Sequence, residues 1–100
     1  MMLHIINKSP YSHTSFNTCL QYAETNSEIL LIEDAVYAAV ADTDASQTLK
    51  QLSPRYSFYA LLPDLKARGL TDKLIREIQV IDDEGFVDLV IKHARNITWT

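Results

Sequence analysis

The stretch Glu28-Ile29-Leu30-Leu31-Ile32 decides the fold, because it places four apolar residues in an unbroken row. A strand with one face in water alternates apolar and polar side chains, whereas an unbroken apolar row suits a strand covered on both faces. Such strands are typical of parallel sheets with helices on either side. The stretch therefore predicts an interior strand.

Four further segments are expected to be strands, at residues 3–7, 56–61, 78–81 and 97–99, the last lying at a sheet edge. Between them, Phe16, Cys19, Leu20 and Ala23 fall on one face of an amphipathic helix. Shorter helices are expected at 33–40, 48–52 and 63–68, with a loop over 42–46 and another short helix from Thr71. A final helix carries a buried stripe of Phe86, Leu89, Val90 and His93.

This alternation of strands and helices implies crossover connections. The fold class is α/β, with about five mostly parallel strands flanked by helices in a single domain over residues 1–100.

Composition excludes several classes of function. The 100 residues contain 9 Lys+Arg and 13 Asp+Glu, a formal charge of −4, which argues against a nucleic-acid surface. One cysteine excludes an intramolecular disulfide, and no ligand cluster has zinc spacing. Gly69 and Gly85, the two glycines, do not form a phosphate-binding loop. No cofactor is therefore expected.

The apolar runs fall well short of the roughly 20 residues that span a membrane, and no secretory signal is visible, so a cytoplasmic location is expected. A chain this small has little wall for a cleft of its own, which favours a partner subunit.

Cys19 is the one residue with strong intrinsic nucleophilicity. A reactive thiol needs exposure and a lowered pKa, but Cys19 shares the apolar stripe of Phe16 and Leu20, well inside its helix. A buried cysteine that packs as a small hydrophobe is the leading interpretation. The acidic pairs Glu33-Asp34 and Asp82-Asp83 suit helix caps better than carboxylate catalysis.

Several stretches, in this order and spacing, resemble the DsrH/TusB family. They are Leu3-His4, Asn7-Lys8-Ser9-Pro10, Leu30 to Ala39, Asp64-Leu65-Lys66-Ala67-Arg68-Gly69-Leu70, Asp82, Gly85-Phe86-Val87-Asp88-Leu89 and Trp99. The resemblance covers nearly the whole chain. Ala35 stands where the family usually has glycine, which puts the local turn in doubt.

The resemblance implies a subunit of the TusBCD or DsrE-DsrF-DsrH sulfur-relay complexes, which are heterohexamers with two copies of each of three subunits. It implies TusC/DsrF-like and TusD/DsrE-like partners, with the sulfur-carrying cysteine on the TusD/DsrE-type subunit. The tRNA branch passes persulfide sulfur to a downstream acceptor protein, toward 2-thiolation of the wobble uridine. This chain is then expected to be a non-catalytic subunit that does not bind nucleic acid directly.

A cysteine at the place of Cys19 resembles the DsrH form of sulfur oxidisers. The alternative is thus a subunit in dissimilatory sulfur oxidation, with Cys19 as a secondary persulfide carrier. Interfaces favour aromatic side chains, and the candidates here are Tyr37, Phe58, Tyr59 and Trp99.

Overall fold

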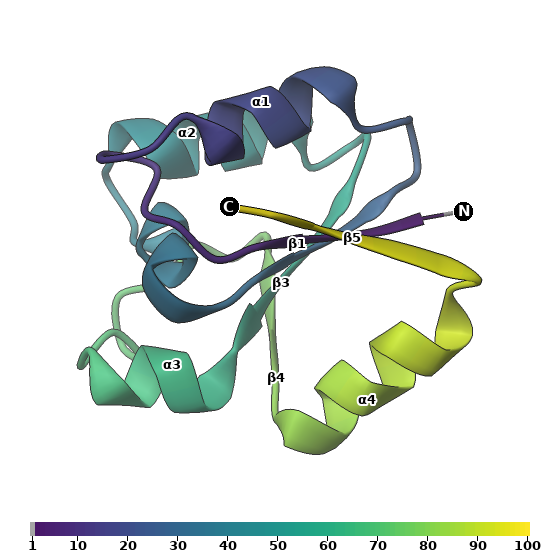
Figure 1. Ribbon diagram of the computed structural model, residues 1–100. Helices are drawn as coiled ribbons and strands as arrows, with labels where there is room; N and C mark the ends of the chain where they lie inside the picture. Colours follow the sequence, from purple (N-terminus) through teal and green to yellow (C-terminus); the bar gives the residue numbers. More distant parts are fainter. Residues whose placement is uncertain (1) are drawn as a thin grey trace.

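The computed structural model describes residues 2–100, which form one five-stranded sheet with helices on both faces (Figure 1). The strands are β1 (Met2–Ile6), β2 (Glu28–Leu31), β3 (Ser57–Leu61), β4 (Ile78–Ile81) and β5 (Arg95–Trp99). The helices are α1 (Ser15–Tyr22), the 3₁₀ helix η1 (Glu33–Ala39), α2 (Asp44–Leu52), α3 (Leu62–Ala67) and α4 (Asp83–Lys92).

All neighbouring strands are parallel, in the order β4-β3-β2-β1-β5. The predicted α/β class is confirmed, and β2 lies in the middle of the sheet with its four residues buried. β5 lies at an edge of the sheet, as the sequence indicated, and it pairs with β1.

The apolar row in β2 is explained by two separate cores. Ile29 and Leu31 belong to the larger core, which also includes Phe16, Cys19 and Leu49 from the helices α1 and α2. Leu30 points to the opposite face, where a smaller core includes Leu89 of α4. Figure 1 shows α1 and α2 on one side of the sheet and α4 on the other.

The predicted loop over residues 42–46 is confirmed only at 42–43 and is wrong over 44–46, because α2 already begins at Asp44. Thr43 and Ser46 form a reciprocal capping box, with Thr43 Oγ1 accepting from the Ser46 N–H at 3.2 Å and Ser46 Oγ accepting from the Thr43 N–H at 3.2 Å. This polar pair carries no apolar periodicity, so the first turn of the helix resembled a loop.

The short helix predicted from Thr71 is also wrong. The segment instead forms an isolated antiparallel bridge between Leu74 and Val40. The Ala41 N–H donates to the Lys73 carbonyl at 2.7 Å, and the Ile75 N–H donates to the Ala39 carbonyl at 3.0 Å. This long-range pairing satisfies the backbone groups that a helix would have paired locally.

The final helix is one residue shorter than its predicted stripe. α4 ends at Lys92, and His93 is its C-cap in extended conformation, although the ring is buried. Within residues 2–100, no helix is long and apolar enough to cross a membrane.

Candidate functional site

Cys19 lies inside the larger core rather than in a cleft. Its side chain is fully buried on the inward face of α1, near Phe16 and Leu20 in the same cluster. Burial disfavours the thiolate and raises the pKa of Cys19 to about 12. In this conformation, the thiol has neither the access nor the ionisation that persulfide chemistry requires.

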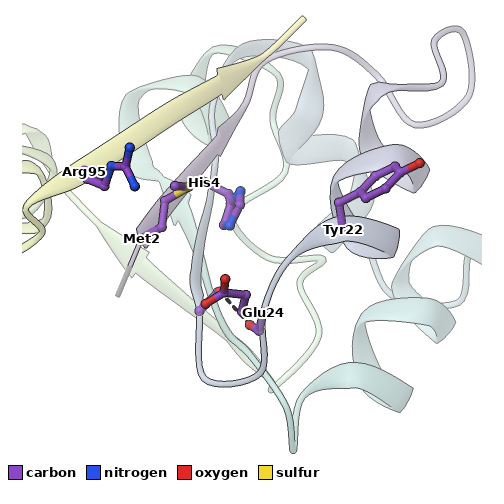
Figure 2. Close-up of a pocket in the computed structure, with 6 residues that line it drawn as sticks. Met2, His4, Tyr22, Glu24 and Arg95 are labelled. Atoms are coloured by element: carbon purple, nitrogen blue, oxygen red, sulfur yellow. Dashed lines mark hydrogen bonds between the residues drawn. The ribbon is translucent and has the colours of Figure 1, made fainter.

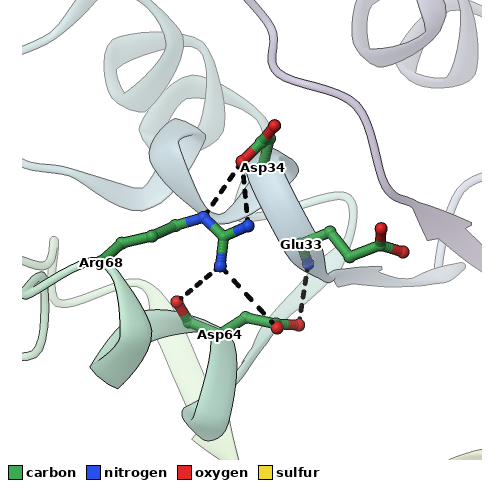
Figure 3. Close-up of polar contacts among 4 residues, drawn as sticks. All are labelled: Glu33, Asp34, Asp64 and Arg68. Carbon is green, nitrogen blue, oxygen red and sulfur yellow. Dashed lines mark hydrogen bonds and ion pairs between the residues drawn. The ribbon is translucent and has the colours of Figure 1, made fainter.

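A second candidate lies at the carboxyl edge of the sheet, where ligands usually bind in open α/β folds. Here η1 follows β2 and α3 follows β3, so the two parallel strands deliver Glu33, Asp34, Asp64 and Arg68 to one place (Figure 3). We call these four residues the carboxyl-edge cluster.

Arg68 is the centre of the carboxyl-edge cluster. Its Nε and Nη2 donate to Asp34 Oδ1 at 3.1 and 2.9 Å, and its Nη1 donates to the Asp64 carbonyl at 3.0 Å. Asp64 Oδ2 also accepts from the Glu33 N–H at 2.8 Å. Asp34 therefore forms an ion pair with Arg68, which favours a structural role for this carboxylate over a catalytic one.

The turn held by this cluster is strained. Glu33 has φ of 50°, a left-handed conformation that non-glycine residues rarely adopt. The bond from its N–H to Asp64 ties the turn to α3. Ala35, where the resemblance led us to expect an altered turn, is fully buried inside η1. The strain therefore lies two residues before Ala35, where Asp64 stabilises it.

A small pocket opens at the amino edge of β1 and β5, lined by Met2, His4, Tyr22, Glu24, Ser27 and Arg95. Figure 2 shows the His4 ring beside Met2 and above Glu24, with Tyr22 on the far side. His4 Nδ1 accepts from Trp99 Nε1–H at 3.0 Å, and because indole nitrogen only donates, the neutral ring carries its proton on Nε2. Burial lowers the pKa of His4, and the charge of Glu24 opposes this shift.

A buried carboxylate lies beneath α4. Glu28 accepts from Tyr59 Oη at 2.5 Å and from Lys92 Nζ at 2.9 Å, and its Oε1 lies 2.6 Å from His93 Nε2. Burial alone would raise the pKa of Glu28, but the three hydrogen bonds and the charge of Lys92 together outweigh it and lower the pKa. Burial, the hydrogen bond and the charge of Glu28 together raise the pKa of Tyr59 to about 12.

These contacts explain most of the aromatic residues that were interface candidates. Phe58 is buried, Tyr59 donates to Glu28, and Trp99 donates to His4. Tyr37 alone among the four is exposed. Within residues 2–100, no group of three His, Cys, Asp or Glu side chains could hold a metal ion.

Comparison with known proteins identifies the chain. A sequence model of the family described as "DsrH like protein" matches residues 8–96. The chain belongs to the DsrH/TusB family. Protein TusB of Pectobacterium parmentieri is 34% identical over 98 residues, covering 98% of this chain and 100% of the relative. Protein TusB of Shigella flexneri is 38% identical over 99 residues, with the same coverage.

Two solved structures share this DsrH/TusB fold. The ychN protein from E. coli superposes with a TM-score of 0.80 at 16% identity, covering 98% of this chain and 97% of that one. Protein MTH1491 of Methanobacterium thermoautotrophicum has a TM-score of 0.67 at 17% identity, covering 97% and 96% of the two chains. At these identities, the likeness concerns the fold alone.

Proposed function

We propose that this chain is a subunit of a sulfur-relay complex that passes persulfide sulfur toward 2-thiolation of the tRNA wobble uridine. The observation that carries the proposal is family membership over the full chain, with relatives named TusB. The formal charge of −4 supports a role in which the chain contacts proteins and leaves the tRNA to a later partner.

The complex is a heterohexamer with two copies each of this chain, a TusC/DsrF-like subunit and a TusD/DsrE-like subunit, acting in the cytoplasm. This chain is a non-catalytic assembly subunit, and the carrier thiol lies on the TusD/DsrE-like partner. There, a thiolate attacks the outer sulfur of a donor persulfide, the donor's sulfur–sulfur bond breaks, and the donor thiolate leaves. The complete burial of Cys19 supports this division of roles.

The experiment is complementation. Cells that lack this chain receive the wild type, Cys19→Ser or Cys19→Ala, and 2-thiouridine in their tRNA is quantified. We expect both variants to restore thiolation once their folding is confirmed. Cys19→Ala is the control for Cys19→Ser, because the serine places a hydroxyl without a hydrogen-bond partner in the core. Restoration by the wild type but by neither folded variant would assign a chemical role to Cys19.

The second candidate function is a DsrH-type subunit in dissimilatory sulfur oxidation, with Cys19 as a secondary persulfide carrier. A folded wild type that fails to restore 2-thiouridine would favour it. Its supporting observation is the presence of a cysteine in α1. It requires an opening of the α1 core that exposes the Cys19 sulfur to the donor.

A further inference from the structure

The outer face of α4 exposes large apolar side chains that the fold does not cover. Val87 is 55% exposed and Ile91 is 75% exposed, and they lie four residues apart on one helix face. Together with Phe86 and Val90 they line a shallow hollow formed only by apolar side chains. Figure 1 shows α4 on the opposite side of the sheet from α1 and α2, so those helices do not cover this face.

An acidic hollow adjoins the apolar one. It is lined by Asp83, Glu84, Val87 and Asp88, so Val87 is shared by the two hollows. Across residues 2–100, none of these three carboxylates forms an ion pair. We call the two adjoining hollows the α4 strip.

Lys92, the cation closest along the helix, does not neutralise the α4 strip. Its Nζ reaches inward to Glu28 Oε1 at 2.9 Å, beside His93. The buried carboxylate thus draws the positive charge of α4 away from the outer face. The α4 strip is left with three negative charges beside an apolar patch.

We propose that the α4 strip is a docking surface for a partner subunit of the relay complex, an inference that rests on the proposed function. The docking segment presents an aliphatic side chain to the hollow between Val87 and Ile91. It also presents a lysine or arginine to the hollow at Asp88. Because Val87 borders both hollows, the two partner side chains lie about one helical turn apart.

A second copy of this chain fits the α4 strip poorly. A two-fold contact between identical strips would set their carboxylates near one another, and like charges across an interface cost stability. Charge complementarity therefore selects a partner with a basic rim. The complete burial of Cys19 is consistent with docking at α4, because a partner bound on that side of the sheet leaves the α1 core closed.

The test measures association of this chain with its two co-expressed partner subunits, by native mass spectrometry and by titration of the purified partners. The strip variants are Ile91→Ala and Asp88→Lys. The matched control is Tyr11→Ala, which removes a 58% exposed side chain away from the α4 strip. Circular dichroism and thermal unfolding confirm that each variant folds, as expected for exposed positions.

We expect each strip variant to weaken association by at least about 10-fold, the effect of a central contact in an interface. Tyr11→Ala should change it by less than about 2-fold. Added salt should weaken the wild-type complex and have less effect on Asp88→Lys. A complex that forms equally well with both strip variants overturns the inference and leaves the proposed function intact.

Failure of the wild type to assemble with either partner refutes the proposed function and the docking surface together. Self-association of the isolated chain that Ile91→Ala abolishes also overturns the inference, because the occupant would then be a second copy.

Discussion

The burial of Cys19 predicts strong protection of its thiol in the folded chain. At about pH 8, a thiol with a pKa of about 12 is ionised in about one molecule in 10⁴, and one at the unperturbed value of 9.0 in about one in ten. Native Cys19 should therefore react with iodoacetamide at least about 10³-fold more slowly than the unfolded chain, before any steric exclusion is counted.

The assay is alkylation followed by intact mass, with the native and urea-unfolded chain compared at the same pH. Since the chain has one cysteine, the added mass reports Cys19 directly. If Cys19 is alkylated only after global unfolding, the alkylation rate falls as the stability of the fold is raised. The alkylation rate of a locally exposed thiol does not depend on global stability in this way. Native and unfolded rates within about 10-fold of one another would refute the argument that the α1 core suppresses the thiol.

Three further predictions concern packing and charge. Glu28→Gln should destabilise the fold by about 2–3 kcal/mol in urea unfolding at neutral pH, because charge-assisted bonds to a buried carboxylate are lost; an unchanged midpoint contradicts this. Because the pKa of Glu28 is lower in the folded chain, its carboxylate adds stability at pH values above the unfolded pKa of 4.5, and this stability is lost as pH falls through the folded pKa. Glu28→Gln should not show this loss of stability in acid. Because burial lowers its pKa, His4 should titrate below 6.5 by imidazole NMR, and its contribution to stability should fade as pH falls below 6.5; a midpoint at or above 6.5 would contradict this effect of burial. The neutral ring should carry its proton on Nε2, and a proton on Nδ1 would contradict the Trp99 contact. Gly85→Ala should lower the free energy of unfolding by about 1 kcal/mol although alanine has the better helix propensity, because an added Cβ would lie 2.8 Å from Ile81 Cβ. A thermal unfolding midpoint at or above that of the wild type would show that Ile81 in β4 can shift to make room.

The sequence predicts the architecture because the decisive signals are local. The apolar row in β2 specified an interior strand, and the helical spacing of Phe16 and Cys19 specified the buried face of α1. The family resemblance, which covers nearly the whole chain, is confirmed by the match over residues 8–96.

Errors arose where polar or long-range contacts determine the conformation. The Thr43–Ser46 capping box starts α2 without any apolar pattern. The bridge between Val40 and Leu74 joins residues far apart in the chain, so local spacing at Thr71 could not reveal it.

The polar contacts were missed for the same reason. Glu28 meets His93 from 65 positions away, and Trp99 meets His4 from 95 positions away. No spacing rule links such residues. The one available signal was Glu28 at the start of β2, where the other residues of the strand are apolar. A carboxylate buried in such a strand requires hydrogen-bond partners.

In the proposed function, this chain assists sulfur relay from within a complex without carrying the sulfur itself. The most direct measurement is intact mass of every subunit after the co-expressed complex has been loaded with sulfur by a cysteine desulfurase and cysteine. We expect a two-two-two assembly in which a partner subunit gains the mass of a sulfur atom and this chain gains none. A persulfide on Cys19 of the assembled complex would contradict it.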